Sequence, residues 1–450
     1  MAKLVVIGGV AAGMSAASKA GRTNKDMEIE VYTDEEYISY AGCGLPYFVA
    51  GMVQEERKLI ARTKEQFARQ GIKVFTNHKV LSILPTEMQI IVVDSEGAEK
   101  KVNYDKLVIA TGARAFVPPL PGKELDNVFT VKSIPSARRI KEQMQSEQVK
   151  NIVIVGGGYI GLEMAEAFAA WKKQITIVEL APQLLGNIDE DMAALVEEYL
   201  VKEGVQIRKG EKVLALEGQD QVRKVVTDKG EIPADLVILA IGIQPNSELA
   251  AEAGIQLGVK KAIKVNKYME TNIPNIYAAG DCATAYHLLY QDDAYIPLGT
   301  TANKQGKVAG ENAAGGKAEF AGIVGTAIIK VLDLEIGRTG LSKREAQQLG
   351  REVQEIKVEA YTKAHFYPGS QAVTIKLLIE KASQKIVGAQ IVGGAGAGKR
   401  IDVLAVAVQL GLTPFALSEL DLSYAPPFSP VWDPVLTAAN VAVGELEKKA

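Results

Sequence analysis

The same short pattern occurs twice in this chain: an apolar strand, a glycine-rich turn and a helix of small residues. The first copy reads Leu4-Val-Val-Ile-Gly8-Gly-Val-Ala-Ala-Gly13, and the second reads Ile152-Val-Ile-Val-Gly156-Gly-Gly-Tyr-Ile-Gly161. Each copy is followed by a further apolar strand, at 29–32 and at 175–179. Strand, turn, helix and strand in this order are typical of a dinucleotide-binding unit. The repeat predicts an α/β protein with two Rossmann-like domains.

The second copy is the more regular of the two. A dinucleotide fold needs one glycine for a tight turn, a second for close approach of the pyrophosphate and a third for helix packing, with an acid about twenty residues later for the ribose. Gly156, Gly158, Gly161 and Glu179 meet these four requirements. The acid would repel a 2′-phosphate, and the following Leu-Ala-Pro supplies no arginine to bind one. We therefore expect NADH here, with NADPH as the alternative.

The first copy departs from the pattern, because Val10 stands where the second glycine belongs and Thr33 and Asp34 end its second strand. Two later segments support it as a flavin unit, Leu107-Val-Ile-Ala-Thr111-Gly112 and Tyr277-Ala-Ala-Gly280-Asp281. One FAD held by three separated pieces of chain would need such segments. The Asp281 carboxylate would accept hydrogen bonds from the ribityl hydroxyls, although an ordinary turn is the alternative explanation of Gly280-Asp281.

Bulk properties exclude several other classes. The chain has 450 residues, which is too many for one ordinary core. Its net charge of −3 provides no overall positive field, so we expect no nucleic-acid partner. It shows no signal-peptide pattern and no apolar stretch long enough for a bilayer, so we expect a cytoplasmic protein without a membrane partner. Two cysteines cannot build a disulfide framework, and we expect no metal site.

The pattern of apolar and polar residues changes after about residue 322. Alternating stretches at 372–379 and 385–392 indicate antiparallel strands, and Gly393-Gly-Ala-Gly-Ala-Gly398 has no acidic strand end at the right distance, so we interpret it as a turn before a helix. A C-terminal α+β domain follows the two nucleotide units. The predicted domains are a discontinuous FAD-binding domain at 1–120 and 246–321, an NAD(P)H-binding domain at 121–245 and a dimerisation domain at 322–450.

Cys43 lies in Ser39-Tyr-Ala-Gly42-Cys43-Gly-Leu-Pro-Tyr, just after the first unit. If a helix begins here, its unpaired amides and its dipole favour the reactive thiolate. No second cysteine follows within the next turn, so the chemistry must use an external thiol or an oxidised sulfur such as a sulfenate. Cys282, beside Asp281, is interpreted as a small buried packing residue.

Together these motifs resemble the single-cysteine branch of the pyridine nucleotide-disulfide reductases, over essentially the whole chain. The most similar members are coenzyme A-disulfide reductases and related persulfide or polysulfide reductases. The resemblance implies that NADH reduces FAD, that Tyr159 covers the flavin until the nicotinamide displaces it, and that Cys43 attacks a sulfur–sulfur bond. NADH oxidases and peroxidases of the same branch use a cysteine sulfenate and a histidine in the first glycine loop. Ala11 occupies that position here, which weighs against peroxide chemistry.

The resemblance also implies a homodimer and a substrate site. Tyr367 and Tyr424 lie in segments that, in the coenzyme A-disulfide reductases, bring two tyrosines from the partner subunit to the active cysteine; interface packing is the alternative. A coenzyme A arm would lie against the first helix, where Ser15, Lys19 and Arg22 share one face, although a solvated face would look the same. The predicted catalytic residues are Cys43, Tyr367 and Tyr424, and the predicted substrate-binding residues are Ser15, Lys19, Arg22, Ser39, Gly42 and Asn303.

Two positions differ from the staphylococcal type of coenzyme A-disulfide reductase, which has an asparagine where Gly42 stands and, near the substrate, a histidine where Asn303 stands. Coenzyme A disulfide, a persulfide and a polysulfide therefore all stay open as substrates. An NADH oxidase or peroxidase is the second hypothesis, and a redox-responsive flavoprotein with negligible turnover is the third. The predicted cofactor-binding residues are Gly8, Val10, Ala11, Gly13, Thr33, Asp34, Val80, Ala110, Thr111, Gly112, Gly156, Gly158, Tyr159, Ile160, Gly161, Glu163, Glu179, Gly242, Gly280 and Asp281.

Overall fold

The computed structural model describes residues 1–448, which divide into two compact units. The first unit combines residues 1–116, 132–138 and 242–323, and the second combines residues 117–131, 139–241 and 324–448. Helix α4 (Ile134–Met144) runs across one of these boundaries along the chain. The three domain ranges expected from the sequence stay a prediction.

The first unit is built on a parallel five-stranded sheet in the order β18-β7-β1-β2-β3. Its strands are short and mainly apolar, and most of their residues are buried, as expected when other layers cover both faces; the exposed Lys73 of β3 is an exception. The sheet strands are β1 (Lys3–Ile7), β2 (Glu28–Tyr32), β3 (Ile72–Phe75), β7 (Lys106–Ile109) and β18 (Ile276–Ala278).

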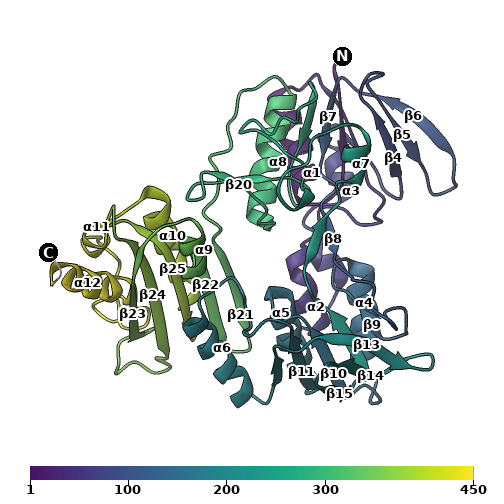
Figure 1. The fold of residues 1–450 in the computed structure, drawn as a ribbon. Coiled ribbons are helices and arrows are strands. Elements are labelled where there is room, and N and C mark those ends of the chain that lie inside the picture. The colour runs from purple at the N-terminus through teal and green to yellow at the C-terminus, as the bar shows by residue number, and fades with distance from the viewer. Residues whose placement is uncertain (449–450) are drawn as a thin grey trace. The chain divides into compact units, whose positions relative to one another are not determined.

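Two long helices pack together on this sheet, α1 (Ala11–Thr23) and α8 (Gly299–Ala313), and they lie side by side in Figure 1. Their close approach depends on small residues. A Cβ on Gly306 would overlap the Ala12 carbonyl oxygen, and one on Gly310 would overlap that of Ala16. The helix that begins at the first glycine loop is thereby fixed against a segment almost 300 residues later in the chain.

Smaller elements complete the first unit. An antiparallel three-stranded sheet, β4-β5-β6, follows β3, and the short strands β8 and β17 pair with each other within this unit. These elements are α2 (Leu45–Val49), α3 (Lys64–Ala68), β4 (Lys79–Leu84), β5 (Gln89–Val93), β6 (Glu99–Asn103), β8 (Ala113–Ala115), β17 (Ile243–Pro245), α7 (Glu248–Glu252), β19 (Ala285–His287) and β20 (Asp292–Ala294).

The second unit contains its own parallel sheet in the order β12-β11-β10-β16-β9. A three-stranded antiparallel sheet, β13-β14-β15, follows it along the chain. The elements are β9 (Val128–Phe129), β10 (Asn151–Val155), α5 (Tyr159–Ala169), β11 (Gln174–Glu179), α6 (Glu190–Lys202), β12 (Gln206–Lys209), β13 (Val213–Gly218), β14 (Val222–Thr227), β15 (Gly230–Pro233) and β16 (Leu236–Leu239).

The C-terminal part of the second unit is an antiparallel sheet in the order β21-β22-β25-β24-β23, with helices packed on it. The two alternating stretches noted in the sequence form β24 and β25, which pair along their length. The elements are β21 (Ala327–Val331), β22 (Leu334–Gly340), α9 (Lys343–Gln348), β23 (Val353–Tyr361), β24 (Ala372–Glu380), β25 (Ile386–Gly393), α10 (Ile401–Leu410), α11 (Pro414–Ser418) and α12 (Pro434–Glu447). The predicted fold class is confirmed.

A buried lysine joins this C-terminal sheet to the start of α6. The Lys376 side chain on β24 is 4% exposed, and its Nζ lies 3.0 Å from Asp189, 2.8 Å from Asp191 and 2.7 Å from Glu355. Burial alone would lower the pKa of Lys376, but its hydrogen bonds to the three carboxylates raise it. The cluster therefore holds a buried charge only because several opposite charges surround it.

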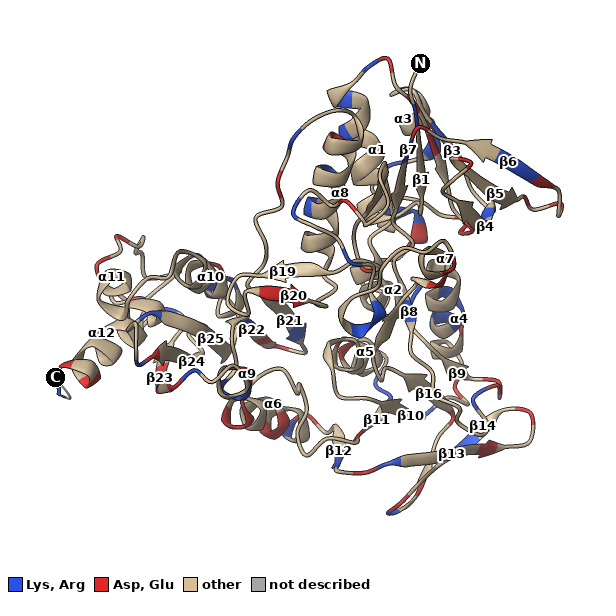
Figure 2. Ribbon diagram, turned by 45° about the horizontal axis from the view of Figure 1, so that its top comes forward, with Lys and Arg blue, Asp and Glu red and all other residues tan. Residues whose placement is uncertain are grey.

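Charged residues are mixed over both units, and the ribbon of α6 carries several acidic positions (Figure 2). No helix within residues 1–448 is long and apolar enough to cross a bilayer. The same stretch of chain contains no cluster of His, Cys, Asp and Glu side chains that could hold a metal ion.

Candidate active site

The glycine loop between β10 and α5 holds three glycines in three different environments. Gly156 has a φ of 109°, and a Cβ there would overlap the Ala240 carbonyl oxygen. A Cβ on Gly161 would overlap the Gly156 carbonyl oxygen, so α5 packs directly on the strand end. At Gly158, by contrast, no atom lies within 4 Å of the Cβ position. Open backbone at the start of a helix is what a pyrophosphate needs, so the loop fits a dinucleotide.

Glu179 ends the neighbouring strand β11 with its carboxylate held by main-chain donors. Its Oε2 accepts a hydrogen bond from Gly157 N at 2.6 Å, and its Oε1 accepts one from Ala181 N at 2.8 Å. The carboxylate is thus fixed at the carboxyl edge of the sheet, beside the glycine loop. Gly242 follows β16 along the chain and is exposed, with a φ of 121°.

Tyr159, the first residue of α5, is tied to the C-terminal sheet through a short chain of hydrogen bonds. Its hydroxyl accepts from Asn187 Nδ2 at 2.7 Å, and Arg338 Nη1 donates to Asn187 O at 2.6 Å. Arg338 is 6% exposed and also pairs with Glu345 at 2.9 Å. Burial raises the pKa of the Tyr159 hydroxyl, so it remains a neutral phenol.

Glu163 lies one turn further along α5, next to the partly buried Ile160. Burial, with a smaller contribution from the charge of Glu166, raises the pKa of Glu163 to about 7. Glu166 itself is buried and forms an ion pair with Lys330 on β21. Glu163 is thus a carboxyl that can be protonated or ionised near neutral pH, which suits a group that donates to or accepts from an amide of a bound nucleotide.

The first glycine loop repeats the turn and packing glycines but not the open one. Gly8 has a φ of 116°, and a Cβ there would overlap the Ala110 carbonyl oxygen. A Cβ on Gly13 would overlap the Gly8 carbonyl oxygen, as at the second loop. Val10, in place of the middle glycine, is partly buried and directly precedes α1, which begins at Ala11.

Strand register brings the predicted flavin segments to one edge of the first sheet. Ile7 pairs with Tyr32 and with Ile109, and Ile109 pairs with Ala278. Because all these strands are parallel, the residues that follow them lie side by side at the carboxyl edge. These residues are Gly8, Thr33, Asp34, Ala110, Thr111, Gly112, Gly280 and Asp281.

Polar contacts fix the second and third of these segments. Thr111 Oγ1 donates to Asn246 O at 2.6 Å, and Asn246 Nδ2 donates back to Thr111 O at 2.9 Å. Gly280 N donates to Gln305 Oε1 at 2.9 Å. Burial raises the pKa of the Asp281 carboxyl, while the charge of Lys132 opposes this shift. A carboxylate disfavoured by burial is one that hydroxyl donors of a ligand would stabilise, which fits the expected role of Asp281.

Three further residues of the predicted flavin site differ in exposure. Thr33 is buried, and its Oγ1 accepts a hydrogen bond from Glu35 N at 3.3 Å. Asp34 is exposed at the strand end, where a ribose hydroxyl can reach its carboxylate. Val80, on β4, is partly buried and packs against the core of the first unit.

Cys43 is exposed in a single 3-10 turn, Gly42–Gly44. Helix α2 follows at once but has only five residues, so the dipole expected to favour a thiolate is that of a very short helix. A Cβ on Gly44 would meet the Leu59 side chain, whereas the space beside Gly42 is open. Ser39 N donates to Gly9 O at 2.8 Å, so the cysteine segment is attached to the first glycine loop.

The predicted coenzyme A residues on α1 contact α8. Ser15 Oγ donates to Asn303 Oδ1 at 2.7 Å, which brings two predicted substrate residues together. Lys19 forms an ion pair with Glu311 at 2.9 Å, so its ammonium already has a carboxylate partner. Arg22 is exposed at the end of the helix. Ser15, Lys19 and Arg22 are among the less buried positions of α1, as are Ala11, Gly21 and Thr23, and their role in binding coenzyme A stays a prediction.

The two tyrosine segments of the C-terminal region lie against each other. Ala364 N donates to Pro426 O at 3.2 Å, which links the segment of Tyr367 to that of Tyr424. Arg400 donates to both segments, to Thr362 O at 3.0 Å and to Phe428 O at 2.9 Å. Tyr424 is 47% exposed. Cys43 belongs to the first unit and the tyrosines belong to the second, so their common role stays a prediction.

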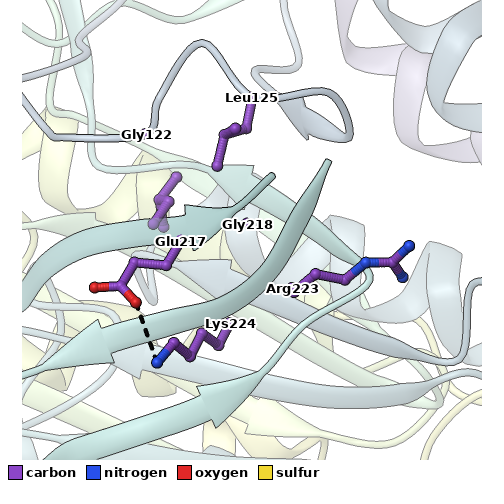
Figure 3. Close-up of a pocket in the computed structure, with 7 residues that line it drawn as sticks. Gly122, Leu125, Glu217, Gly218, Arg223 and Lys224 are labelled. Atoms are coloured by element: carbon purple, nitrogen blue, oxygen red, sulfur yellow. Dashed lines mark ion pairs between the residues drawn. The ribbon is translucent and has the colours of Figure 1, made fainter. Parts of the chain in front are cut away.

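A surface hollow of about 570 Å³ lies on the β13–β14 hairpin (Figure 3). Lys224 forms an ion pair there with Glu217 at 3.1 Å. None of the residues predicted as site residues lines it. Its lining residues are Gly122, Leu125, Leu216, Glu217, Gly218, Arg223 and Lys224.

Several supporting residues were missed from the sequence. Asn187, Asn246 and Gln305 hold Tyr159, Thr111 and Gly280 in place. Each acts across at least 25 positions of chain, and none belongs to a recognisable motif. No spacing in the sequence could have identified them, because their partners are set by tertiary packing.

Comparison with known proteins places the chain among flavin-linked reductases. A family described as "Pyridine nucleotide-disulphide oxidoreductase" matches residues 2–306, and its dimerisation domain matches residues 326–434. The "NAD(P)H coenzyme A polysulfide/persulfide reductase" of Pyrococcus horikoshii is 40% identical over 440 residues, which is 98% of each chain.

Two further proteins extend this likeness. An "NADH oxidase" of Methanocaldococcus jannaschii is 39% identical over 449 residues, covering 99% of this chain and all of that protein. The solved structure of an NAD-dependent persulfide reductase from A. fulgidus matches with a TM-score of 0.96 at 40% identity, covering 99% of this chain and 84% of that one.

Proposed function

The chain belongs to the pyridine nucleotide-disulphide oxidoreductase family, and on that premise we propose that it reduces coenzyme A disulfide, or a related persulfide or polysulfide, with electrons from NAD(P)H. It is an enzyme that uses FAD and NAD(P)H. The observation that carries the choice of substrate class is the single exposed cysteine, Cys43, beside the first glycine loop, while Cys282 is fully buried.

The two parallel sheets supply the nucleotide sites. The loop at Gly156–Gly161 would hold the pyrophosphate of NAD(P)H, and the fixed carboxylate of Glu179 would accept the ribose hydroxyls. The edge that gathers Gly8, Thr111 and Asp281 would hold FAD. When bound, FAD supplies the two electrons that it takes from reduced nicotinamide.

The sulfur chemistry would take place on Cys43. Its thiolate attacks one sulfur of the substrate, a new bond forms to Cys43 Sγ, and the sulfur–sulfur bond of the substrate breaks. The other sulfur leaves as a thiolate and takes a proton. Two electrons and a proton then return the mixed disulfide to a Cys43 thiolate and a second thiol.

A proton donor for the leaving sulfur would come from Tyr367 or Tyr424 of a second copy of the chain. The dimerisation domain carries both residues, and the homodimer is part of the proposal. Support comes from the contact between their two segments and from the exposure of Tyr424. A phenol hydroxyl can donate a hydrogen bond to a leaving thiolate and can serve as a general acid.

The coenzyme A arm would lie along the outer face of α1. Ser15 and Asn303 are in contact there, and Ser39, Gly42 and Arg22 offer polar or open positions. Lys19 would have to exchange Glu311 for a phosphate. The proposal therefore extends to a substrate that carries phosphates, as the name of the Pyrococcus horikoshii relative also suggests.

An NADH oxidase is the second candidate, because the Methanocaldococcus jannaschii relative bears that name at 39% identity. In that reaction Cys43 would cycle through a sulfenate. Ala11 replaces the histidine that accompanies peroxide chemistry in the resembling enzymes.

Steady-state oxidation of NADH with a panel of acceptors separates these candidates. We expect the highest kcat/KM with coenzyme A disulfide, a coenzyme A persulfide or polysulfide, and a much lower value with dioxygen or peroxide. Intact-mass analysis of protein isolated without reductant should show a thiol adduct on Cys43 and none on Cys282. A single added oxygen on Cys43, with dioxygen as the best acceptor, would establish the oxidase instead.

A further inference from the structure

A lysine stands opposite the ribose-binding acid on the next strand of the second sheet. Strands β11 and β12 pair in parallel register, and Lys209 is the partner of Glu179. The two strand ends remain attached beyond this pair, because Gly210 N donates to Ala181 O at 2.9 Å and Glu211 N donates to Glu179 O at 3.1 Å. Lys209 therefore ends its strand at the same edge of the sheet as Glu179.

This position is where NADPH would differ from NADH. The two cofactors differ only in the 2′-phosphate on the adenosine ribose, and that ribose binds at the acid which ends the second strand. A cation near the acid is the usual partner for the phosphate. The residues that follow the acid, Leu180, Ala181 and Pro182, carry no charge. Lys209 on the next strand has the charge and the position for this role.

Glu197 of α6 engages that cation. Its Oε2 forms an ion pair with Lys209 Nζ, and its Oε1 accepts a hydrogen bond from Leu184 N at 2.8 Å. The Glu197 side chain is 13% exposed and that of Lys209 is 37% exposed. Since Leu184 is buried and contacts the Gly157 position of the glycine loop, Glu197 is anchored to the rim of the nucleotide site.

The other charged groups at this edge do not replace Lys209. Arg208 is paired with the buried Glu211 at 2.8 Å. Lys229 donates to the main-chain oxygen of Lys209 at 3.1 Å. The carboxylates of Glu179 and Glu197 balance the charges of Lys209 and Lys229, so the edge offers a phosphate no excess positive charge.

We propose that Glu197 is a second determinant of nicotinamide specificity: by pairing with Lys209 it withholds from the 2′-phosphate of NADPH an ammonium that is otherwise well placed. The proposal rests on the proposed function only in placing the adenosine ribose at Glu179. Two effects would then favour NADH over NADPH. Glu179 repels the 2′-phosphate, and Glu197 occupies the Lys209 ammonium that could otherwise bind it.

Calorimetric titration of the purified FAD-loaded protein with ADP-ribose and with 2′-phospho-ADP-ribose tests this directly, because neither ligand reacts. Glu197→Gln keeps an oxygen for Leu184 N and removes only the charge. We expect the ratio of the two dissociation constants to shift about tenfold toward the phosphorylated ligand, and the shift to shrink at high salt.

Lys209→Met and the double variant Glu197→Gln/Lys209→Met are the matched controls. If the released ammonium causes the shift, the double variant should lose it. An unchanged ratio in Glu197→Gln, or a shift that persists in the double variant, would overturn the proposal. Equal melting temperatures and flavin contents establish that the variants are folded. If Glu197→Gln does not fold, Glu197→Ala takes its place, because it also releases the Lys209 ammonium; the same shift is expected, and an unchanged ratio would overturn the proposal.

Failure of the underlying function gives a different result. If ADP-ribose does not bind the unmodified protein, or binds with the same affinity after Glu179→Ala, the ribose is not at Glu179 and the specificity proposal is wrong, whereas the reaction proposed at Cys43 is unaffected. If ADP-ribose binds as expected but no disulfide is reduced, only the proposed reaction is wrong.

Discussion

At the scale of single residues, the two cysteines occupy opposite environments. Cys43 is exposed between two glycines. Cys282 is fully buried, with its Sγ 3.5 Å from Ile109 O and 3.4 Å from Ala279 O, and burial raises the pKa of its thiol. Because thiol reactivity depends on access and on the thiolate form, Cys43 alone of the two is placed to react.

Replacing Cys43 with serine should separate flavin reduction from disulfide reduction. The variant should retain FAD and be reduced by NADH at close to the normal rate, because electron transfer to the flavin precedes the thiol chemistry. Turnover with every disulfide should fall by at least about a thousandfold, as expected when a nucleophile is lost. Stopped-flow absorbance measures flavin reduction by NADH, and steady-state assays measure turnover with disulfides.

Cys282→Ala is the control for this prediction. It removes a buried sulfur that the mechanism does not use, so it should cost some stability and leave turnover within about threefold. Full disulfide turnover by Cys43→Ser, or loss of turnover only in Cys282→Ala, would move the reaction away from Cys43.

Glu179 should make NADH the better electron donor. Its carboxylate is held by Gly157 N and Ala181 N, so it cannot turn away from a 2′-phosphate without breaking two hydrogen bonds. We expect kcat/KM for NADH to exceed that for NADPH by at least about tenfold, or about 1.4 kcal/mol. Initial rates of flavin reduction with each donor measure the ratio. Equal efficiency with NADPH would contradict this role of Glu179.

At the scale of elements, the Lys376 cluster joins β24, β23 and the start of α6. We expect Lys376→Met to lower the free energy of unfolding by about 3 kcal/mol, because three carboxylates would lose their common cation. Partial exposure of Asp191 and Glu355 keeps the loss at the lower end of the range for buried pairs. Urea unfolding followed by circular dichroism measures it, with the exposed pair variant Lys381→Met as the control.

The same cluster predicts a pH dependence. Burial alone would raise the pKa of Asp191 and of Glu355, but hydrogen bonds from Lys376 and from Lys357 or Lys343 lower it below the usual range. A carboxyl with a lowered pKa stabilises the fold above its unfolded pKa, near 4, and loses that contribution as the pH falls through the folded value. The stability gap between the native protein and Lys376→Met should therefore narrow below about pH 4. If the difference in free energy of unfolding between the two proteins does not change with pH, Lys376→Met destabilises the fold through lost packing and not through lost ion pairs.

The parallel strands and their glycine turns could be predicted from the sequence because their signals are local. Runs such as Leu4–Ile7 and Ile152–Val155 are continuous and apolar, and the turn glycines follow them at once. The C-terminal strands could be predicted because the alternation of apolar and polar residues is also a local signal. These segments form β1, β10, β24 and β25, each within two residues of its expected start.

The remaining features depend on contacts between distant parts of the chain. The three-stranded sheet at β4–β6 lacks a strong pattern, and the Lys376 cluster joins residues nearly 190 positions apart. The ion pair of Lys19 with Glu311 could not be predicted from the sequence either. A helix face of one serine and two cations has the same sequence pattern whether water or a neighbouring helix covers it. Spacing identifies the residue types of a site, but packing decides which of them are already engaged.

At the scale of the whole molecule, we expect an obligate homodimer in which Tyr424 serves the cysteine of the other subunit. Tyr424→Phe should lower kcat for disulfide reduction by about tenfold to a hundredfold, because a proton donor is lost and only one oxygen is removed. Flavin content and the dimer mass by analytical ultracentrifugation should not change. A solved structure with Tyr424 far from Cys43 of either subunit would contradict the shared site.

The interleaving of the two units along the chain has a consequence for biosynthesis. The first sheet opens with β1 at the N-terminus but is not complete until β18 has been made, whereas the second sheet is complete once β16 has been made. During translation the later-starting nucleotide domain can therefore close first, with the N-terminal segment waiting for its last strand and for α8. Ribosome-bound chains arrested between β16 and β18 should already protect residues 139–241 from protease and leave residues 1–116 sensitive. FAD, on this account, is acquired late, after the NAD(P)H domain has folded.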